Sequence, residues 1–213
     1  MTSPLDLAPV VPVVVLDDVE AAVPLARALV AGGLPAVEVT LRTEAALGAI
    51  ERIAAEVEGA RVGAGTVLTP EQAKAAAAAG ATFLVTPGTT ESLVGALQET
   101  GLDFLPGTST VSEVLRLREL GIREMKFFPA EAAGGAPFLK SLASPVPDVR
   151  FCPTGGITPE SAPSYLALPN VACVGGSWML PGASVAARDW GQIEALARAA
   201  SRLRDKTAGG TPA

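Results

Sequence analysis

Lys126 is the lysine whose place in the sequence is most unusual for its type. Three other lysines, Lys74, Lys140 and Lys206, fall on expected polar helical faces or in the C-terminal tail, where lysine is ordinarily solvated. Lys126 instead lies within a segment that we expect to be a barrel strand. Burial disfavours the charged form of an amine and so favours a nucleophilic one. Lys126 is therefore a candidate for covalent catalysis. The alternative is a strand lysine whose head reaches solvent or a buried carboxylate.

A polar stripe runs along the expected strand at residues 36–41. Side chains alternate between the two faces of a strand, so Glu38, Thr40 and Arg42 share one face and apolar residues occupy the other. The outer face of a barrel packs against helices, so the polar face should point inward. A glutamate and an arginine near the end of this strand indicate a site. The alternative is an internal salt bridge of Glu38 with Arg42 or Lys126.

Two glycine-rich segments follow the last two expected strands. They contain Gly155 and Gly156 in the first case, and Gly176 and Ser177 in the second. Such turns can present backbone N–H groups to a phosphate, and barrels commonly bind phosphate after strands seven and eight. Tight turns also need glycine, which is the structural alternative.

The chain contains no histidine. This excludes the commonest general base, the Ser/His and Cys/His nucleophile pairs, and the usual ligands of catalytic zinc. Cys152 and Cys173 fall in or beside late strands and are expected to be small core residues. We therefore expect no metal and no cofactor, so that Lys, Glu, Asp, Arg, hydroxyl groups and backbone carry any chemistry.

Short β-branched runs alternate with Ala- and Leu-rich helical segments. This alternation is typical of parallel strands joined by crossover helices, and eight such units predict an α/β protein with a single (β/α)8 TIM barrel. A doubly wound open sheet is the alternative. The expected strands are 10–16, 36–41, 61–66, 82–86, 103–106, 124–128, 150–153 and 171–174, and the expected helices are 18–32, 44–57, 70–79, 90–100, 110–120, 136–143, 158–167 and 188–204.

The boundaries of the domain and of two helices can also be predicted. One domain is expected over residues 1–206, and the Gly-, Thr- and Pro-rich tail at 207–213 is expected to be disordered. Thr69 and Thr158 each precede a proline, which predicts that a helix begins there.

Charge and hydropathy exclude two kinds of partner. A net charge of −6 and a pI near 4.8 argue against binding to nucleic acid. The longest apolar run, near residues 10–16, contains Pro12 and is far shorter than the ~20 residues that cross a bilayer. That segment lacks the basic leader of a secretory signal, and two cysteines make no disulfide framework. We expect a cytoplasmic protein.

Several motifs together resemble a known family. The set is similar to the bacterial 2-keto-3-deoxy-6-phosphogluconate aldolases, also called 4-hydroxy-2-oxoglutarate aldolases, from about Val11 through Leu180. The motifs are Glu-Val-Thr-Leu-Arg-Thr at 38–43, Gly-Ala-Gly-Thr-Val at 63–67, Lys-Phe-Phe-Pro-Ala-Glu at 126–131, Phe-Cys-Pro-Thr-Gly-Gly-Ile at 151–157 and Gly-Gly-Ser-Trp at 175–178.

The resemblance implies a role for each matching residue. Lys126 would form the Schiff base with a 2-keto acid, and Glu38 would be the acid and base. Residues implied to bind substrate are Arg42 and Thr66 at the carboxylate end, Pro87 lining the pocket, Thr154 as a polar wall residue, and Gly155, Gly156, Gly176 and Ser177 at the phosphate end.

The resemblance further implies cleavage of the phosphogluconate substrate to pyruvate and glyceraldehyde 3-phosphate, activity on 4-hydroxy-2-oxoglutarate, a place in the Entner–Doudoroff pathway and a homotrimer. Alternatives are a 2-keto-3-deoxy-6-phosphogalactonate aldolase, a non-catalytic barrel that binds a phosphate ligand, and an isomerase with Glu38 as its base. Two departures are the short extension before Val11 and Ala133, where many relatives are expected to carry a polar residue.

Overall fold

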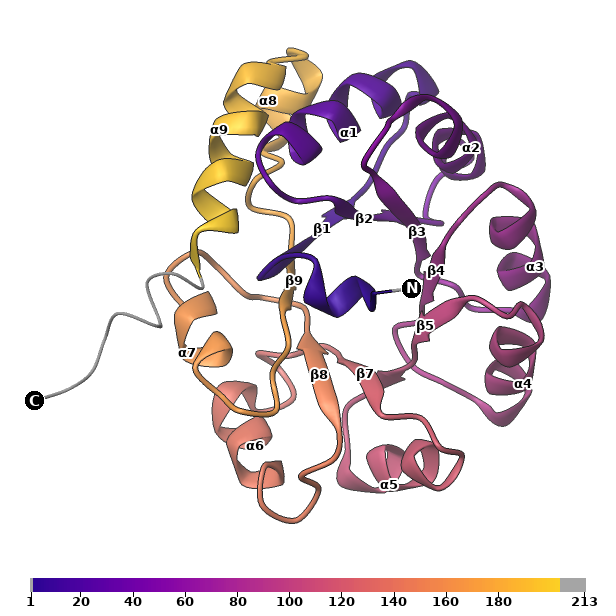
Figure 1. Ribbon diagram of the computed structural model, residues 1–213, viewed down its shortest axis with the longest axis vertical. Coiled ribbons are helices and arrows are strands. Elements are labelled where there is room, and N and C mark those ends of the chain that lie inside the picture. The colour runs from indigo at the N-terminus through magenta and orange to yellow at the C-terminus, as the bar shows by residue number, and fades with distance from the viewer. Residues whose placement is uncertain (1, 204–213) are drawn as a thin grey trace, which may run out of the picture.

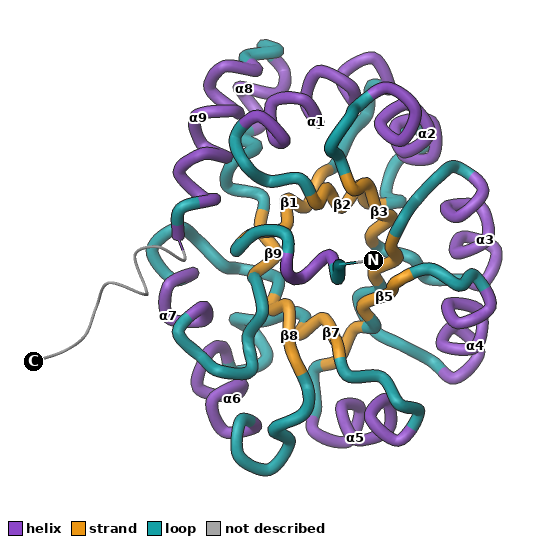
Figure 2. Tube along the Cα trace, viewed as in Figure 1, coloured by secondary structure: helices purple, strands orange, loops and turns teal. Residues whose placement is uncertain are grey.

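The computed structural model describes residues 2–203 of the chain. Parallel strands form a ring, and the helices lie outside it (Figure 1). The tube in Figure 2 shows the same arrangement, with strands lining the centre and helices at the periphery. A doubly wound open sheet has helices on both faces, whereas these α-helices lie only on the outer side of the ring. The doubly wound sheet is therefore excluded. The predicted tail at 207–213 and Lys206 lie outside the described residues.

The strands pair as two hydrogen-bonded parallel sheets, ordered β5-β4-β3-β2-β1-β9 and β6-β7-β8. Seven of the eight predicted strands match a strand closely, and the eighth is shifted toward the C-terminus. The strands are β1 (Val10–Val14), β2 (Ala36–Thr40), β3 (Arg61–Gly65), β4 (Phe83–Val85), β5 (Asp103–Leu105), β6 (Gly107–Thr108), β7 (Glu124–Phe127), β8 (Arg150–Pro153) and β9 (Val174–Gly176).

The two sheets meet at two places in the ring. Between β5 and β6 stands Pro106, which has no N–H to donate, although its carbonyl accepts a hydrogen bond from Lys126 N at 3.0 Å. Between β8 and β9 the pairing is reduced to two isolated bridges, Phe151 with Val171 and Thr154 with Gly175. The α/β fold with a curled parallel sheet is therefore confirmed. Within the described residues the strands pair as two separate sheets, whereas one continuous barrel was predicted.

Most predicted helices are present within the described residues, and the helix expected at 158–167 differs at its start. Thr69 begins a helix as expected, with its side chain accepting a hydrogen bond from Gln72 N. The helix expected from Thr158 begins only at Ala162, because Thr158 and Ser161 bond to each other in a preceding turn. The helices are α1 (Ala22–Ala31), α2 (Ala46–Glu56), α3 (Pro70–Ala78), α4 (Glu91–Glu99), α5 (Val111–Glu119), α6 (Gly135–Leu142), α7 (Ala162–Leu166), α8 (Gly182–Ala186) and α9 (Trp190–Ser201), with 3-10 turns η1 (Pro4–Asp6) and η2 (Val19–Ala21).

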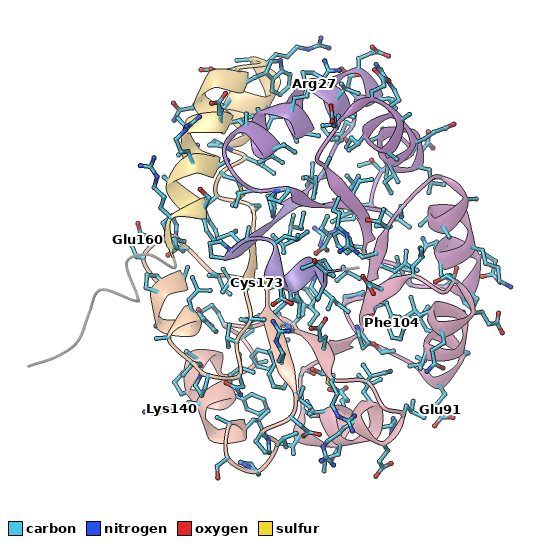
Figure 3. The ribbon with its side chains drawn as sticks, in the orientation of Figure 1. Arg27, Glu91, Phe104, Lys140, Glu160 and Cys173 are labelled. Atoms are coloured by element: carbon cyan, nitrogen blue, oxygen red, sulfur yellow. The ribbon has the colours of Figure 1, made fainter. Side chains whose placement is uncertain are left out.

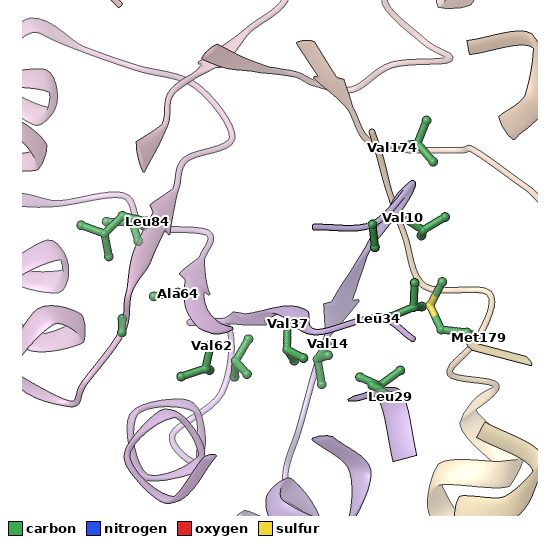
Figure 4. Close-up of a cluster of buried hydrophobic side chains, with 14 of the residues drawn as sticks. Val10, Val14, Leu29, Leu34, Val37, Val62, Ala64, Leu84, Val174 and Met179 are labelled. Atoms are coloured by element: carbon green, nitrogen blue, oxygen red, sulfur yellow. The ribbon is translucent and has the colours of Figure 1, made fainter. Parts of the chain in front are cut away.

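The outer faces of the strands supply the main core. Val14, Val37 and Val62 point from β1, β2 and β3 toward the surrounding helices, as Figure 4 shows. The polar residues of β2, Glu38 and Thr40, alternate with its valines and point to the inside of the ring. In Figure 3, Lys140 lies at the periphery, whereas Cys173 lies near the ring of strands. None of the described helices is long and apolar enough to cross a membrane.

The N-terminal turn η1 closes the amino-terminal end of the ring. Leu5 is fully buried in an inner apolar cluster with Phe83 and both cysteines, which confirms the cysteines as core residues. Around it, Ser3 donates a hydrogen bond of 2.6 Å to Glu124, the first residue of β7. Asp6 pairs with Arg150, the first residue of β8. The short N-terminal extension therefore packs directly into the amino-terminal end of the ring.

Candidate active site

A buried ion pair lies inside the ring. Lys126 comes from β7 and Glu38 from β2, and their Nζ and Oε1 atoms are 3.1 Å apart. Lys126 is 5% exposed and Glu38 is 2% exposed. Gly65 on β3 leaves room for the carboxylate, since a Cβ there would lie 2.1 Å from Glu38 Oε1. The ammonium also lies 5.5 Å from the centre of the Phe128 ring. The amine is thus next to a group that can take or return its proton.

The polar face of β2 leads from this pair toward the carboxyl end of the strand. Thr40 is fully buried, and its hydroxyl donates to the carbonyl of Val14 at 2.9 Å. Arg42 follows the strand and is exposed, and its Nε donates to Thr66 Oγ1 at 3.2 Å. Thr66 has a φ of 57°, a left-handed conformation unusual for a residue branched at Cβ. Arg42 and Thr66, both predicted to bind substrate, therefore contact each other through this Nε donor.

Pro87 lies after β4, where its backbone is packed tightly. A Cβ on Gly107 would lie 2.3 Å from the Pro87 carbonyl carbon, so only glycine fits there. Thr86 is fully buried and accepts a hydrogen bond from Gly107 N at 2.9 Å. Thr89 donates to the Gly107 carbonyl at 3.1 Å. These contacts hold Pro87 against β6, the neighbour of the strand that carries Lys126.

Thr154 stands after β8 and is 7% exposed. Gly175 on β9 faces it, and a Cβ there would come within 2.2 Å of Thr154 Oγ1. The Thr154 backbone N–H donates to Phe127 O at 2.9 Å, which ties it to the end of β7. Thr154 thus lies next to the strand that carries Lys126.

The predicted phosphate-end glycines differ in their conformations. Gly155 and Gly156 have φ values of 106° and 80°, which L side chains rarely adopt. Gly176 has no such φ, but a Cβ there would collide with the Trp178 ring at 1.9 Å. Ser177 is exposed directly after β9. All four lie at the carboxyl ends of β8 and β9, on the same side of the ring as Arg42.

A cleft of about 570 Å³ opens at the same side of the ring. Ser177 lines it, together with residues from the end of β1 and from α8, whereas Lys126 and Glu38 are not among its lining residues. Arg188 is its basic lining residue. Its side chain pairs with Asp18 at 2.8 Å, and its φ is 54°. Ser177 is thus the predicted site residue that this cleft shares.

No group of three or more Cys, Asp or Glu side chains within residues 2–203 could hold a metal ion. The side chains near Lys126 are a carboxylate, hydroxyl groups and an aromatic ring, which suit covalent and proton-transfer chemistry. The absence of a cofactor remains a prediction.

Sequence reasoning missed the residues that make room for the site. Gly65, Gly107 and Gly175 each lie where a side chain would strike Glu38, Pro87 or Thr154. A glycine inside an expected strand was the available signal, because such a residue weakens a strand unless a close approach requires it. The Thr86 and Thr89 contacts had no signal, since a threonine is ordinary in strands and turns.

Comparisons with a family model, with known sequences and with solved structures give consistent results. Residues 1–196 match the family model described as "KDPG and KHG aldolase". The chain is 52% identical over 196 residues to the KHG/KDPG aldolase of Escherichia coli (strain K12), covering 92% of each chain. Among solved structures, KDPG aldolase from Legionella pneumophila, with pyruvate captured as a covalent carbinolamine intermediate, superposes with a TM-score of 0.91 at 45% identity, covering 94% of this chain and 98% of that one. The enzyme of Zymomonas mobilis ZM4 with 3-phosphoglycerate gives a TM-score of 0.89 at 50% identity, covering 94% of each chain.

Proposed function

Because the chain belongs to the KDPG and KHG aldolase family, we propose that it cleaves 2-keto-3-deoxy-6-phosphogluconate to pyruvate and glyceraldehyde 3-phosphate through a Schiff base on Lys126. The observation that carries this proposal is the buried Lys126 amine 3.1 Å from the Glu38 carboxylate. The printed name of the Escherichia coli relative covers both KHG and KDPG, which supports 4-hydroxy-2-oxoglutarate as a second substrate.

The first half of the reaction forms the imine. Glu38 accepts a proton from the Lys126 ammonium, and the freed amine attacks the C2 ketone to give a carbinolamine. Glu38, through a water molecule, then returns the proton to the C2 hydroxyl, which leaves as water. The product is an iminium ion joined to Lys126 Nζ. The carbinolamine captured in the Legionella pneumophila relative supports this order of steps.

The second half breaks the carbon chain. Glu38 or its water takes the proton of the C4 hydroxyl, the C3–C4 bond breaks, and its electron pair moves into the iminium to form an enamine. The C4 fragment leaves as the aldehyde. The enamine is then protonated at C3, and water hydrolyses the resulting iminium to pyruvate and free Lys126. Protons balance across the two halves, and no cofactor is required.

The remaining site residues orient the substrate. Arg42 offers a planar pair of donors for the keto-acid carboxylate, beside the Thr66 hydroxyl to which it bonds. Pro87 and Thr154 border the space between that carboxylate and the amine. Such orientation can lower the barrier by several kcal/mol.

At the far end of the substrate, backbone N–H groups of the Gly155, Gly156 and Gly176 segments, with the Ser177 hydroxyl, receive the phosphate. Two left-handed glycines in succession support this assignment, because such turns expose N–H groups to an anion. The phosphorylated ligand in the Zymomonas mobilis relative supports a phosphate-bearing substrate.

Several broader features belong to the same proposal. We infer that β5 and β6 count as one strand interrupted at Pro106, so that the two sheets together make an eight-stranded barrel. One domain over residues 1–206, a homotrimer, a cytoplasmic location and a place in the Entner–Doudoroff pathway also remain proposals. They rest on the family and on the sequence.

Reduction of the imine tests the function directly. The protein is incubated with pyruvate and sodium borohydride, digested, and examined by mass spectrometry. A reduced pyruvyl adduct on Lys126 is expected. Folded protein without an adduct would overturn the proposal and favour a non-catalytic barrel in which Lys126 and Glu38 form a structural ion pair. Cleavage rates on the phosphogluconate and phosphogalactonate epimers then decide between the two aldolase substrates.

A further inference from the structure

Glu131 lies in the loop that follows the lysine strand, and its carboxylate reaches α7. Glu131 Oε1 accepts a hydrogen bond of 2.7 Å from the hydroxyl of Tyr165 on α7. Tyr165 is 1% exposed, so its hydroxyl has little access to water and depends on this acceptor. Burial and the hydrogen bond to Glu131 raise the pKa of Tyr165 well above its usual range. The hydroxyl therefore stays a donor at physiological pH.

The same glutamate touches the glycine turn. Its backbone N–H donates to the Gly155 carbonyl at 3.1 Å. Its side chain lies against Gly156, where an added Cβ would come within 2.7 Å of Glu131 Cγ. Gly155 in turn packs near the Phe128 ring, at 3.3 Å from where a Cβ would stand. Glu131 therefore contacts both residues of the turn with backbone and side chain together.

The surroundings of this hydrogen bond are tight. A Cβ on Gly135, at the start of α6, would lie 3.3 Å from the Tyr165 hydroxyl. The backbone of Ala130 donates to Thr154 O at 2.8 Å, so the loop after β7 is bonded to the segment after β8 at two successive residues. Three segments thus meet at Glu131: the loop after the lysine strand, the glycine turn and α7.

From this arrangement we propose that Glu131 and Tyr165 are positioning residues that hold the Gly155–Gly156 turn in the conformation that receives the phosphate of the substrate. Glu131 does not touch the reacting atoms. Its hydrogen bond to Tyr165 holds the Glu131 carboxylate against α7, and this fixes the turn on the side opposite the incoming phosphate. The role rests on the proposed function, since it concerns the phosphate end of that same substrate.

The proposed role of Glu131 and Tyr165 predicts a specific change in the kinetic constants. Loss of either partner should leave the lysine chemistry intact and weaken binding of the phosphorylated substrate. A hydrogen bond between a hydroxyl and a charged group is strong enough for its loss to raise KM about 10-fold. We expect Glu131→Ala and Tyr165→Phe each to raise KM for 2-keto-3-deoxy-6-phosphogluconate about 10-fold, with kcat changed by less than about 3-fold.

Three further variants make the test specific. Glu131→Gln keeps an acceptor for the Tyr165 hydroxyl and should restore KM to near the wild-type value. The double variant Glu131→Ala/Tyr165→Phe should lose no more than either single variant, because both remove the same hydrogen bond. Asp148→Asn is the matched control. It disrupts exposed ion pairs of Asp148 with Arg118 and Arg123, and Asp148 contacts no residue of the site.

The experiment measures kcat and KM for the phosphorylated sugar acid and for the same acid without phosphate, together with borohydride trapping of pyruvate and the unfolding midpoint. A rise in KM confined to the phosphorylated acid, with normal trapping, supports the proposal. Equal losses on both acids, or a lower unfolding midpoint with an unchanged KM ratio, would show a purely structural hydrogen bond and overturn it. Wild-type protein that fails to trap pyruvate would instead overturn the proposed function.

Discussion

The Lys126 amine and the Glu38 carboxylate lie 3.1 Å apart inside the ring, although 88 positions separate the two residues in the sequence. Both are nearly removed from solvent. Burying two opposite charges costs desolvation free energy that their mutual attraction does not reliably repay, so stability alone is a weak reason for such a pair. A site that must pass protons between an amine and a bound carbonyl compound gives it a chemical reason.

Replacing Lys126 with Met should abolish covalent capture of pyruvate, because no other group of the site can form an imine. The thioether side chain keeps most of the volume of lysine. Mass spectrometry after borohydride reduction measures the adduct. Lys140→Met is the control, since Lys140 is exposed on α6 and should leave the adduct unchanged. An adduct that persists in the Lys126 variant would remove that residue from the mechanism.

Replacing Glu38 with Gln should reduce kcat by about 10²–10⁴, the usual contribution of a positioned acid and base. The amide retains the shape of the carboxylate but cannot accept and return a proton. Some imine should still form over long incubation, because water can replace the proton transfer slowly. Steady-state cleavage rates and the time course of pyruvate trapping measure the two effects. Unaltered kcat would leave Glu38 with a structural role alone.

Replacing Arg42 with Lys should raise KM for the keto acid about 10-fold, since a single ammonium cannot reproduce the planar pair of donors. The hydrogen bond to Thr66 Oγ1 would also be lost. Arg27→Lys is the matched control, because Arg27 bonds the Glu56 carbonyl on the helical layer. The prediction is contradicted if both variants show the wild-type KM.

Replacing Arg188 with glycine should give a more stable protein than replacing it with alanine. Its φ of 54° is left-handed, which costs a non-glycine residue about 1–2 kcal/mol, whereas glycine adopts it freely. Both substitutions remove the exposed ion pair with Asp18, so that loss cancels in the comparison. After the greater freedom of glycine in the unfolded chain is subtracted, Arg188→Gly should exceed Arg188→Ala by about 0.5–1 kcal/mol in urea unfolding.

Glu113 should make the folded state sensitive to acid. Burial acts to raise its pKa, but the hydrogen bonds that its carboxylate accepts from Ser109 and Thr110 outweigh burial and lower it. A lowered folded-state pKa adds stability above the unfolded value near 4.5, and this stability disappears as pH falls through the folded value.

Substitution of Glu113 therefore tests the capping box at the start of α5. Glu113→Gln should cost about 0.5–1 kcal/mol at pH 7, a value reduced for partial exposure, and the cost should be smaller at pH 3 because protonation weakens the hydrogen bonds that the carboxylate accepts. Glu119→Gln, at the exposed end of the same helix, is the control. A cost that stays constant between these two pH values would contradict the argument.

The two central site residues could be predicted because each follows a strong rule. Lysine and glutamate are rarely buried, so their presence on the inner face of expected strands indicated a site, and the alternation in β2 gave Glu38 the correct face. A salt bridge between them is one of the alternatives that the sequence admits. Pairing across the ring depends on strand order and curvature, which local patterns do not contain.

Other parts could not be predicted because they depend on long-range contacts. β6 contains only two residues after Pro106, too few for a recognisable pattern. α7 and α8 have five residues each, which is too short for a helical repeat to be recognised in the sequence. The hydrogen bond between Glu131 and Tyr165 joins residues 34 positions apart, and nothing in either segment alone indicates it.

Within the described residues, the N-terminal turn that places Leu5 inside the ring fills the amino-terminal end of that ring. In the proposed reaction, substrate enters and both products leave at the carboxyl ends of the strands, on the side of Arg42 and Ser177. In the proposed mechanism, the aldehyde fragment is not attached to the protein, whereas the pyruvyl fragment is still bonded to Lys126 after cleavage. The two products should therefore leave in a fixed order. The aldehyde leaves first, and water then enters the vacated space. Pyruvate leaves only after hydrolysis of its bond to Lys126.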